Sequence, residues 1–354
     1  MDFASQPHPG ADRPGASLRP LAGTPAEIVA LVEAWLVEPT EPEPLIVETS
    51  GSTGAPKRVV LSRRAVLASV AATADRLRAE GRWVLALPPT YVAGLMVIVR
   101  SLAAGSRPVL IDDHASLGAA VAAAGSPSFV ALVPTQLRRL LDDPGDAAAL
   151  GRVHTVLLGG GPVDPRLRAR ARDAGIDVVA TYGSSETSGG CVYDGVPLDG
   201  VAVELDPDGR IRLGGPMLFD AYDGDPTLTT ATLVDGWFVT SDLGRWREDG
   251  RLQVLGRIDD VAISGGVNVP TPAVAARLRE HPALAAVEVL GVPDREWGER
   301  VVAFVVGDLP LEELRDFVAA ELPRAWAPRQ VVTLEALPLL TNGKTDRTAL
   351  KELA

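Results

Sequence analysis

The chain has 354 residues, a formal charge of −12 and one cysteine, Cys191. Its acids and bases are interspersed, which argues against non-specific nucleic-acid binding because such binding depends on a basic surface. One cysteine cannot form an internal disulfide, and no apolar run approaches the ~20 residues of a membrane helix. We therefore expect a cytoplasmic protein without membrane insertion, and the sequence leaves open a homodimer.

The first part of the chain alternates helix and strand signals. Residues 1–20 are rich in Pro, Gly and Ala and are expected to be loose. Thr24-Pro25-Ala26-Glu27 is a capping box that predicts the start of a helix, and a strand is expected at Leu45–Glu48. Ser62 is expected to cap a helix. The predicted buried face of that helix comprises Leu67, Val70, Ala71, Ala74 and Leu77.

Further apolar runs predict a sheet. The expected strands are Trp83–Leu87, Val109–Ile111, Phe129–Val133, Val156–Leu158 and Val178–Ala180. Helical stretches lie between most of them, and this alternation predicts a largely parallel sheet covered by helices. Ligands of such sheets bind beyond the carboxyl ends of the strands, so the loops that leave the strands are candidate sites.

The pattern changes from about Val192 to short strands and tight turns. Asp206-Pro207-Asp208-Gly209 and Glu248-Asp249-Gly250 each lie between strand-like segments and predict hairpins. After Arg257 the chain alternates helix and strand signals again. We therefore predict an α/β protein with two domains. Residues 1–257 would form a large domain with a mostly parallel sheet and a strand-rich subdomain, and residues 258–354 a small α+β domain.

The strongest local motif is Thr49-Ser50-Gly51-Ser52-Thr53-Gly54-Ala55-Pro56-Lys57, directly after the first predicted strand. Its glycines allow close approach of the backbone to a ligand, its hydroxyls can donate to phosphate oxygens, and Lys57 adds a cation. It lacks the Gly-Lys-Ser/Thr ending of the Walker P-loop. The alternative is a flexible turn. The run resembles the phosphate loop of the adenylate-forming superfamily, which includes acyl-CoA synthetases, peptide-synthetase adenylation domains and luciferases.

Two further motifs resemble nucleotide-binding segments of that superfamily. Gly159-Gly160-Gly161-Pro162 resembles the glycine turn that lies along the nucleotide, through Gly160 and Gly161. Tyr182-Gly183-Ser184-Ser185-Glu186-Thr187 resembles its Tyr-Gly-x-Thr-Glu motif, with Ser185 where threonine is usual. The resemblance implies that Tyr182, Gly183 and Ser185 contact the nucleotide, with Tyr182 against adenine, and that Glu186 helps to hold Mg²⁺.

Three motifs in the second half continue the resemblance. Thr240-Ser241-Asp242 resembles the segment whose aspartate binds the ribose hydroxyls. Gly256-Arg257-Ile258-Asp259-Asp260 resembles the hinge, which implies Arg257 near the ribose and Asp259 as the pivot of a mobile C-terminal domain. Asn342-Gly343-Lys344 resembles the loop of the adenylation lysine. Taken singly, Asp242 and Glu186 have a simpler interpretation as turn-forming acids.

Six motifs in the superfamily's order identify the chain as a member. The resemblance implies an ATP-dependent acid–CoA ligase that uses ATP, Mg²⁺ and CoA. An acid carboxylate would attack the α-phosphorus of ATP and release pyrophosphate, and CoA would then displace AMP from the acyl-adenylate. Lys57, Glu186 and Lys344 are the implied catalytic residues, since fixed cations and backbone donors stabilise the developing phosphate charge.

A closer resemblance is to a short bacterial form of the o-succinylbenzoate–CoA ligases of menaquinone biosynthesis. Only 48 residues precede Thr49, against about 150 more in most superfamily members. The runs Ser185–Gly195 and Ile263–Val269 support this match. Tyr91 stands where histidine is common, which leaves the gating of the acid pocket unsettled.

The acid, o-succinylbenzoate, has a second carboxylate, so its pocket should offer a donor or a cation. Thr135, Gln136 and Arg139 are our candidates, with Tyr91, because Thr135 is a plausible helix cap and a carboxylate is favourable near a helix N-terminus. The alternative is that Arg138 and Arg139 are solvated surface residues. In that case they would pair with Asp142 and Asp143.

Other functions have weaker support. The four histidines show no metal-ligand spacing, Gly-x-Ser-x-Gly is absent, and Cys191 is expected to be a buried small residue rather than a nucleophile. A ligase for another aryl or short acid, or one that loads a carrier-protein thiol, remains open. A nucleotide-binding pseudoenzyme is disfavoured because the implied site residues Lys57, Glu186, Asp242, Arg257 and Lys344 are intact.

Overall fold

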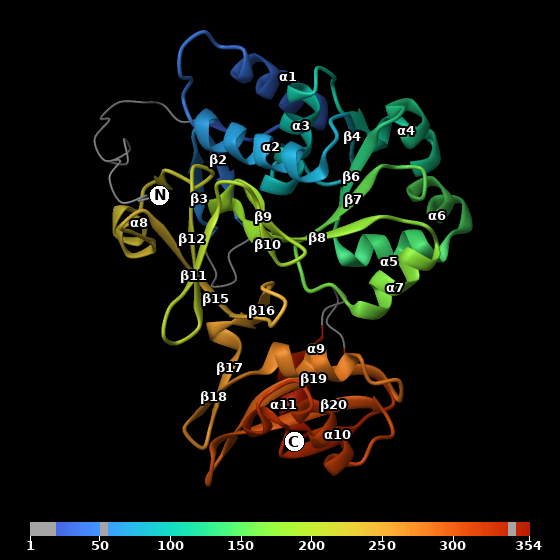
Figure 1. Ribbon diagram of the computed structural model, residues 1–354, viewed down its shortest axis with the longest axis vertical. Coiled ribbons are helices and arrows are strands. Elements are labelled where there is room, and N and C mark those ends of the chain that lie inside the picture. The colour runs from blue at the N-terminus through green and yellow to red at the C-terminus, as the bar shows by residue number, and fades with distance from the viewer. Residues whose placement is uncertain (1–18, 50–55, 339–344) are drawn as a thin grey trace. The chain divides into compact units, whose positions relative to one another are not determined.

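The computed structural model describes residues 19–49, 56–338 and 345–354. Within these ranges the protein has a mixed α/β fold that divides into two compact units (Figure 1). The first unit comprises Met1–Val163, Leu167–Glu204 and Arg212–Val239, and the second Asp164–Arg166, Leu205–Ile211 and Thr240–Ala354. The predicted fold class is confirmed, whereas the domain boundary after Arg257 stays a prediction.

The main sheet of the first unit, as far as the chain is described, has seven strands in the order β10-β9-β8-β7-β6-β4-β5. The five strands β4 to β8 run parallel, and β9 and β10 are antiparallel to their neighbours. Each strand predicted from an apolar run is present, although β8 is longer than expected. The bounds are β4 Arg82–Leu85, β5 Val109–Leu110, β6 Ser128–Leu132, β7 Thr155–Leu158, β8 Val178–Ser184, β9 Gly189–Tyr193 and β10 Val196–Pro197.

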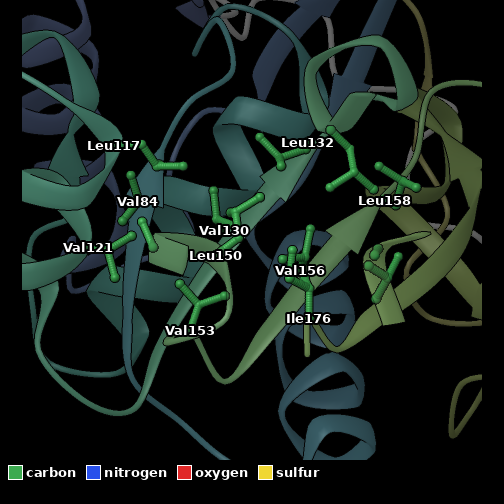
Figure 2. Packing of buried hydrophobic residues seen from close by; sticks show 14 of the residues in the cluster. Val84, Leu117, Val121, Val130, Leu132, Leu150, Val153, Val156, Leu158 and Ile176 are labelled. Atoms are coloured by element: carbon green, nitrogen blue, oxygen red, sulfur yellow. The ribbon is translucent and has the colours of Figure 1, made fainter. Parts of the chain in front are cut away.

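One face of this sheet is covered by four helices. Alternate strand residues such as Val84, Val130 and Val156 are fully buried against them, and Figure 2 shows this cluster. Burial of each such side chain is worth roughly 1.5–3 kcal/mol, so the cluster holds the strands as one rigid layer. The helices are α4 Leu117–Ala124, α5 Pro134–Asp142, α6 Pro144–Leu150 and α7 Pro165–Asp173.

Three helices from the start of the chain pack with the other side of the sheet, and their bounds are α1 Pro25–Leu36, α2 Arg63–Leu77 and α3 Val92–Ala103. Helix α1 begins at the predicted capping box, in which the Glu27 amide donates to Thr24 Oγ1 and the Thr24 amide donates to Glu27 Oε2.

The predicted buried face of α2 was only partly right: Val70 is buried as predicted, and Ala74 and Leu77 are half-buried. Leu67 is 39% exposed and Ala71 is exposed, whereas the polar residues Ser69 and Thr73 are buried. The hydroxyls are satisfied there, because Ser69 Oγ donates to the Ser188 carbonyl at 2.9 Å and Thr73 Oγ1 lies 3.1 Å from the Tyr193 hydroxyl. Ser62 occupies the N-cap position of α2 but its side chain makes no capping hydrogen bond.

A smaller sheet of the first unit has the order β1-β2-β3-β13 in the described residues. β2 and β3 are antiparallel neighbours on either side of the phosphate-loop motif, and β13 pairs with β3 from far along the chain. The bounds are β1 Arg19–Pro20, β2 Leu45–Glu48, β3 Arg58–Leu61 and β13 Ala221–Tyr222. A short helix, α8 Pro226–Thr232, follows β13.

A third sheet contains both predicted hairpins. Asp206–Gly209 joins β11 to β12, where the Gly209 amide donates to the Asp206 carbonyl, and Glu248–Gly250 lies in the turn between β15 and β16. The predicted turn chemistry is therefore confirmed. The bounds are β11 Ala202–Leu205, β12 Arg210–Gly214, β14 Leu233–Val234, β15 Trp237–Trp246 and β16 Leu252–Arg257.

The second unit has its own sheet and core. Its described strands follow the order β18-β17-β20-β19, with β21 beside β20, and helices α9 and α10 pack on one face around Val274, Leu278 and Leu314. The bounds are β17 Val261–Ser264, β18 Val267–Pro270, α9 Thr271–Arg279, β19 Leu284–Asp294, β20 Gly298–Gly307, α10 Leu311–Ala319, β21 Gln330–Thr333 and α11 Arg347–Glu352. No helix in the described part of the chain is both long and apolar enough to span a membrane.

Candidate active site

The predicted nucleotide segments of the first unit meet at one edge of the main sheet. The glycine turn at Gly160 and Gly161 follows β7, and Ser185 and Glu186 follow β8, which is the neighbour of β7 in the sheet. Both segments therefore leave the carboxyl ends of adjacent parallel strands, where ligands of such sheets bind. Gly160 has a φ of +76°, a left-handed conformation that favours glycine at this turn.

A short 3₁₀ turn, Ser185–Thr187, presents Glu186. The turn is closed by Thr187, whose Oγ1 accepts from the Ser184 amide at 2.8 Å and donates to the Gly189 carbonyl at 2.7 Å. Gly183 is needed where β8 and β9 come close together, since a Cβ there would lie 2.2 Å from the Gly189 carbonyl oxygen. The glycine of this motif therefore has a packing role in addition to the predicted nucleotide contact.

Glu186 is 7% exposed, and its Oε1 accepts a hydrogen bond of 2.8 Å from the Tyr222 hydroxyl. Burial, followed by the nearby Glu186 charge, raises the pKa of Tyr222, so the phenol stays protonated and acts as the donor. Tyr222 was not among the predicted site residues, and no sequence motif pointed to it.

The two ends of the phosphate-loop motif are held together by the backbone. The Thr49 amide donates to the Lys57 carbonyl at 2.9 Å, and the Lys57 amide donates to Thr49 Oγ1 at 3.3 Å. Lys57 Nζ lies 5.3 Å from the centre of the Tyr222 ring, so Lys57 and Glu186 both contact this tyrosine. The predicted loop residues between them, Ser50, Gly51, Ser52, Thr53 and Gly54, lie outside the described residues.

Tyr182, the predicted adenine contact, lies near the end of β8 and is half-buried. It pairs with Val192 of β9, so its backbone belongs to the sheet and only its side chain is available to a ligand. Its assignment to the adenine stays a prediction.

The predicted acid-binding residues lie after β4 and β6 and are mostly exposed. Tyr91, at the N-cap of α3, is 48% exposed, and Thr135 and Arg139 are exposed on α5. The prediction that Thr135 caps this helix was wrong, because the helix begins at Pro134 and Val133 is its N-cap. The proline restricts the preceding residue to extended backbone and so sets the start one residue earlier.

Gln136 holds the two strand ends together. Its amide nitrogen donates to the Ala86 carbonyl at 2.9 Å, and its Oε1 accepts from the Val133 amide at 3.0 Å. Asp142, considered above as a partner of the neighbouring arginines, pairs with Arg170 at 2.8 Å. The predicted acid-binding roles of Tyr91, Thr135, Gln136 and Arg139 stay predictions.

Arg100 is a buried cation that sequence reasoning missed. It lies on the apolar helix α3, is only 8% exposed, and its guanidinium carbon is 5.3 Å from the centre of the Trp83 ring. Its Nη2 makes long contacts to Thr73 Oγ1 at 3.4 Å and to the Tyr193 hydroxyl at 3.5 Å. Among the described residues its Nε has no hydrogen-bond partner and its guanidinium no acidic one.

A buried charge without a partner destabilises a protein by several kcal/mol, so Arg100 needs an explanation. It borders a pocket of about 50 Å³ whose lining also includes Glu80 and Gly81, directly before the start of β4. Another side of the Arg100 guanidinium faces Gly189. A Cβ atom placed on this glycine would lie 4.0 Å from Arg100 Nη2. Gly189 is three residues beyond Glu186, so Arg100 lies beside the segment that carries the candidate metal ligand. An arginine within an apolar helical run was the sequence signal.

The second unit contains the other predicted nucleotide residues. Asp242 of β15 lies opposite Arg257 of β16 in the antiparallel pair, so the two predicted ribose contacts are neighbours in one sheet. The Asp242 amide donates to Thr240 Oγ1 at 3.0 Å, which fixes the backbone of this motif.

The predicted hinge residue Asp259 lies in the 3₁₀ turn Ile258–Asp260 and pairs with Arg257 at 3.2 Å. The side chains of this pair are 43% and 63% exposed, for Arg257 and Asp259 respectively. Lys344 lies outside the described residues. The helix that follows it, α11, is capped by Asp346, and Arg347 pairs with Asp260 at 2.6 Å and with Glu288 at 2.9 Å.

The described residues contain no group of three or more His, Cys, Asp or Glu side chains that could hold a metal by themselves. Glu186 offers one buried carboxylate, of which Oε1 is engaged by Tyr222. This arrangement fits Mg²⁺, which is commonly bound by one or two carboxylates together with substrate phosphates and waters.

The family model described as "AMP-binding enzyme" matches residues 36–220, which include the glycine turn and the Glu186 motif. The model "AMP-binding enzyme C-terminal domain" matches residues 273–344. The chain belongs to the AMP-binding enzyme family. The membership predicted from six ordered motifs is thereby confirmed.

Relatives of this AMP-binding enzyme share most of its length. It is 45% identical over 319 residues to a "probable 2-succinylbenzoate–CoA ligase" of Mycobacterium tuberculosis, covering 86% of this chain and 83% of the relative. It is 32% identical over 356 residues to a 2-succinylbenzoate–CoA ligase of Listeria monocytogenes, covering 96% and 75%. The o-succinylbenzoate CoA synthetase of Bacillus subtilis, solved with its acyl-adenylate intermediate, superposes with a TM-score of 0.69 at 29% identity, covering 87% and 68%.

Proposed function

We propose that this protein is an ATP-dependent o-succinylbenzoate–CoA ligase. It would convert the acid and ATP to an acyl-adenylate and pyrophosphate, and then the adenylate and CoA to the thioester and AMP. The observation that carries the proposal is the 45% identity with a ligase of that name over 86% of this chain and 83% of the relative. A match that spans both chains is not explained by a shared nucleotide-binding segment alone. We place the reaction in the cytoplasm, as part of the same proposal.

In the first half-reaction the site must stabilise charge that develops on the phosphates. Lys57 would supply a fixed cation from the end of the phosphate-loop motif, and the backbone amides of that motif would donate to phosphate oxygens. Glu186 would hold Mg²⁺, which when bound neutralises phosphate charge. Tyr182 and Gly160 would border the nucleotide at the carboxyl edge of the sheet.

The acid needs a counter-charge for its second carboxylate, and Arg100 is the group best suited to supply one. It is buried, it has no acidic partner in the described part of the chain, and it lies beside Gly189. A carboxylate that paired with it would relieve the unfavourable burial of the guanidinium, so the interaction would be strong. Arg139 is exposed, and a contact there would be weakened by solvent.

The second half-reaction needs an open path for the CoA thiol once pyrophosphate has left. We propose that the C-terminal domain rotates about Asp259 between the two steps, with Lys344 at the reacting phosphate only during adenylation. Asp259 is suited to this role because its ion pair with Arg257 is exposed and therefore easily exchanged for water.

Release of pyrophosphate tests the proposal. The protein is incubated with ATP and Mg²⁺ and with o-succinylbenzoate or benzoate, and pyrophosphate is measured before and after addition of CoA. We expect catalytic efficiency with o-succinylbenzoate to exceed that with benzoate by about 30-fold or more, since one charge-assisted contact in a buried site is worth about 2 kcal/mol or more. Equal efficiencies would contradict the assignment of the acid.

A ligase for another aryl or short acid is the second candidate. The comparison that separates the two uses a panel of monocarboxylic and dicarboxylic acids, with CoA and a carrier protein as alternative acceptors. Preference for a monocarboxylic acid would favour the second candidate, since Arg100 would then have no carboxylate to bind.

A further inference from the structure

We infer that Tyr222 is a positioning residue for adenylation, whose hydroxyl orients the Glu186 carboxylate while its ring supports Lys57. The inference rests on the proposed function, because it takes Glu186 and Lys57 as the groups that act on the phosphates. It assigns a role to a residue outside every motif considered above.

One side chain joins two groups of opposite charge from distant parts of the sequence. Tyr222 is 4% exposed, its hydroxyl lies 2.8 Å from Glu186 Oε1, and Lys57 Nζ lies 5.3 Å from its ring centre. A cation within about 6 Å of an aromatic ring centre is attracted by the ring, and a donor to an ionised carboxylate is stronger than a neutral pair. The tyrosine therefore fixes both groups relative to each other.

Tyr222 is itself held on several sides. Its backbone pairs with Val59 in β3, two residues after Lys57, and its amide donates to Thr229 Oγ1 at 2.9 Å. Its ring centre lies 4.8 Å from that of Phe219, whose amide donates to the Glu186 carbonyl at 2.9 Å. The segment from Phe219 to Tyr222 is thus bonded both to the strand that leaves the phosphate loop and to the turn that carries Glu186.

This arrangement gives the hydroxyl a specific task. A carboxylate that binds a metal must present one oxygen in a fixed direction, and hydrogen bonds from a second layer of residues set that direction. The Tyr222 hydroxyl occupies Oε1 and so directs Oε2 towards a ligand. The alternative is that the Tyr222 hydroxyl only satisfies a buried carboxylate and has no effect on metal binding. Measuring the affinity for a metal ion separates the positioning role from this structural role.

The test is the affinity for Mn²⁺, a spectroscopic substitute for Mg²⁺, in the presence of ATP and without acid, so that no turnover occurs. Free Mn²⁺ is measured by electron paramagnetic resonance in the full-length protein. Tyr222→Phe keeps the ring over which Lys57 lies and removes only the hydroxyl. We expect its dissociation constant for Mn²⁺ to rise by about tenfold, the lower end of the effect of losing such a partner. An unchanged constant would overturn the inference.

A control separates this effect from general loss of stability. Val60→Ala creates a cavity in β3 beside the same strand pair, leaves the hydroxyl in place, and should lower the melting temperature without changing the Mn²⁺ constant. An equal loss of Mn²⁺ affinity in Val60→Ala would assign the Tyr222→Phe result to instability and would also overturn the inference.

A double-mutant cycle with Glu186→Gln provides the second measurement. If Tyr222 acts through Glu186, removing the hydroxyl in the Glu186→Gln background should change the Mn²⁺ constant less than twofold, so the two substitutions are not additive. Full additivity would refute the positioning role. Because the binding assay contains no acid, it stands whether or not wild-type protein releases pyrophosphate with o-succinylbenzoate, and failure of the substrate assignment is seen separately.

Discussion

The edge of the main sheet and the turn around Asp259 hold their candidate residues in different ways. Glu186 is 7% exposed and is fixed by a buried tyrosine and by a turn with two Thr187 hydrogen bonds. Asp259 is paired only with its near neighbour Arg257 among the described residues, and the side chains of both are more than 40% exposed. One region is therefore organised before a ligand arrives, and the other can change its partners at little cost.

This difference matches the needs of a two-step reaction. Groups that act on the phosphates benefit from a fixed geometry, because no energy is then spent on rearranging them as charge develops. Groups that serve one step and must leave before the next benefit from weak contacts. The predictions below test whether the first region is as rigid, and the second as loosely held, as these contacts indicate.

The largest effect is expected for Cys191, which lies on β9 within the rigid region. Burial raises the pKa of its thiol to about 12, against about 8.5 for an exposed thiol, so the native thiolate at pH 8 should be suppressed by about 10³-fold. Alkylation by iodoacetamide, followed by mass spectrometry, should be slower in the native protein by at least that factor than in the chain unfolded in urea. A native rate within tenfold of the unfolded rate would show that this edge opens readily.

The raised pKa of the Cys191 thiol also predicts how the free energy of unfolding depends on pH. The folded thiol keeps its proton to a higher pH than the unfolded thiol, so its contribution to stability is constant below about pH 8.5 and falls as pH rises towards 12. Cys191→Ala should therefore flatten the alkaline limb of a plot of unfolding free energy against pH.

Lys344→Ala tests the proposed rotation of the C-terminal domain about Asp259. We expect adenylate formation to slow by about 10²–10³-fold, the usual effect of removing one contact to developing charge, while thioester formation from pre-made acyl-adenylate stays nearly intact. Each half-reaction is assayed separately by rapid quench. Equal damage to both steps would make the lysine a general binding residue and would remove the main argument for two domain arrangements.

Arg100→Met removes a buried charge and keeps most of the side-chain volume. Catalytic efficiency with o-succinylbenzoate should fall by about 30- to 150-fold, from the loss of about 2–3 kcal/mol, whereas benzoate should be affected far less. The free energy of unfolding should rise, because an apolar group replaces an uncompensated charge. A fall in both activity and stability would point to a structural arginine.

Arg139→Ala is the comparison that decides between the two arginines. The predicted acid-binding role of Arg139 requires the preference for o-succinylbenzoate over benzoate to disappear in this variant, and the role proposed for Arg100 requires it to persist.

The smallest effect is expected for Asp259→Asn. It removes one partner of an exposed ion pair, so the free energy of unfolding measured in urea should change by less than about 0.5 kcal/mol. A loss of several kcal/mol would mean that this turn is as firmly held as the Glu186 turn.

Most of the fold could be predicted because its signals are local. The Thr24 capping box, the apolar strands and the Asp206–Gly209 turn are each determined by a few neighbouring residues, and all are present as predicted. The inner face of α2 could not be predicted in this way. Ser69 and Thr73 are buried because partners more than a hundred residues away satisfy their hydroxyls, and no local pattern reports such partners.

The candidate site residues also fall into those with a local sequence signal and those without one. Glu186 and Lys57 could be proposed from contiguous motifs, whereas Tyr222 and Arg100 become candidates only through contacts made by the folded chain. Tyr222 is distant in sequence from its polar partners Glu186 and Lys57. It is positioned beside them by the pairing of β13 with β3. The Thr135 cap failed for a local reason, since the preceding Pro134 fixes the helix start.

The pairing of β13 with β3 has a consequence for synthesis of the chain. Val59 and Val60 find their partners in Tyr222 and Ala221, so ribosomes must extend the chain by some 160 residues before this strand is covered. Until then β3 presents an open apolar edge, which other unfinished chains could pair with. Fragments that end before Ala221 should therefore aggregate, and slow translation between β3 and β13 should increase the need for chaperones.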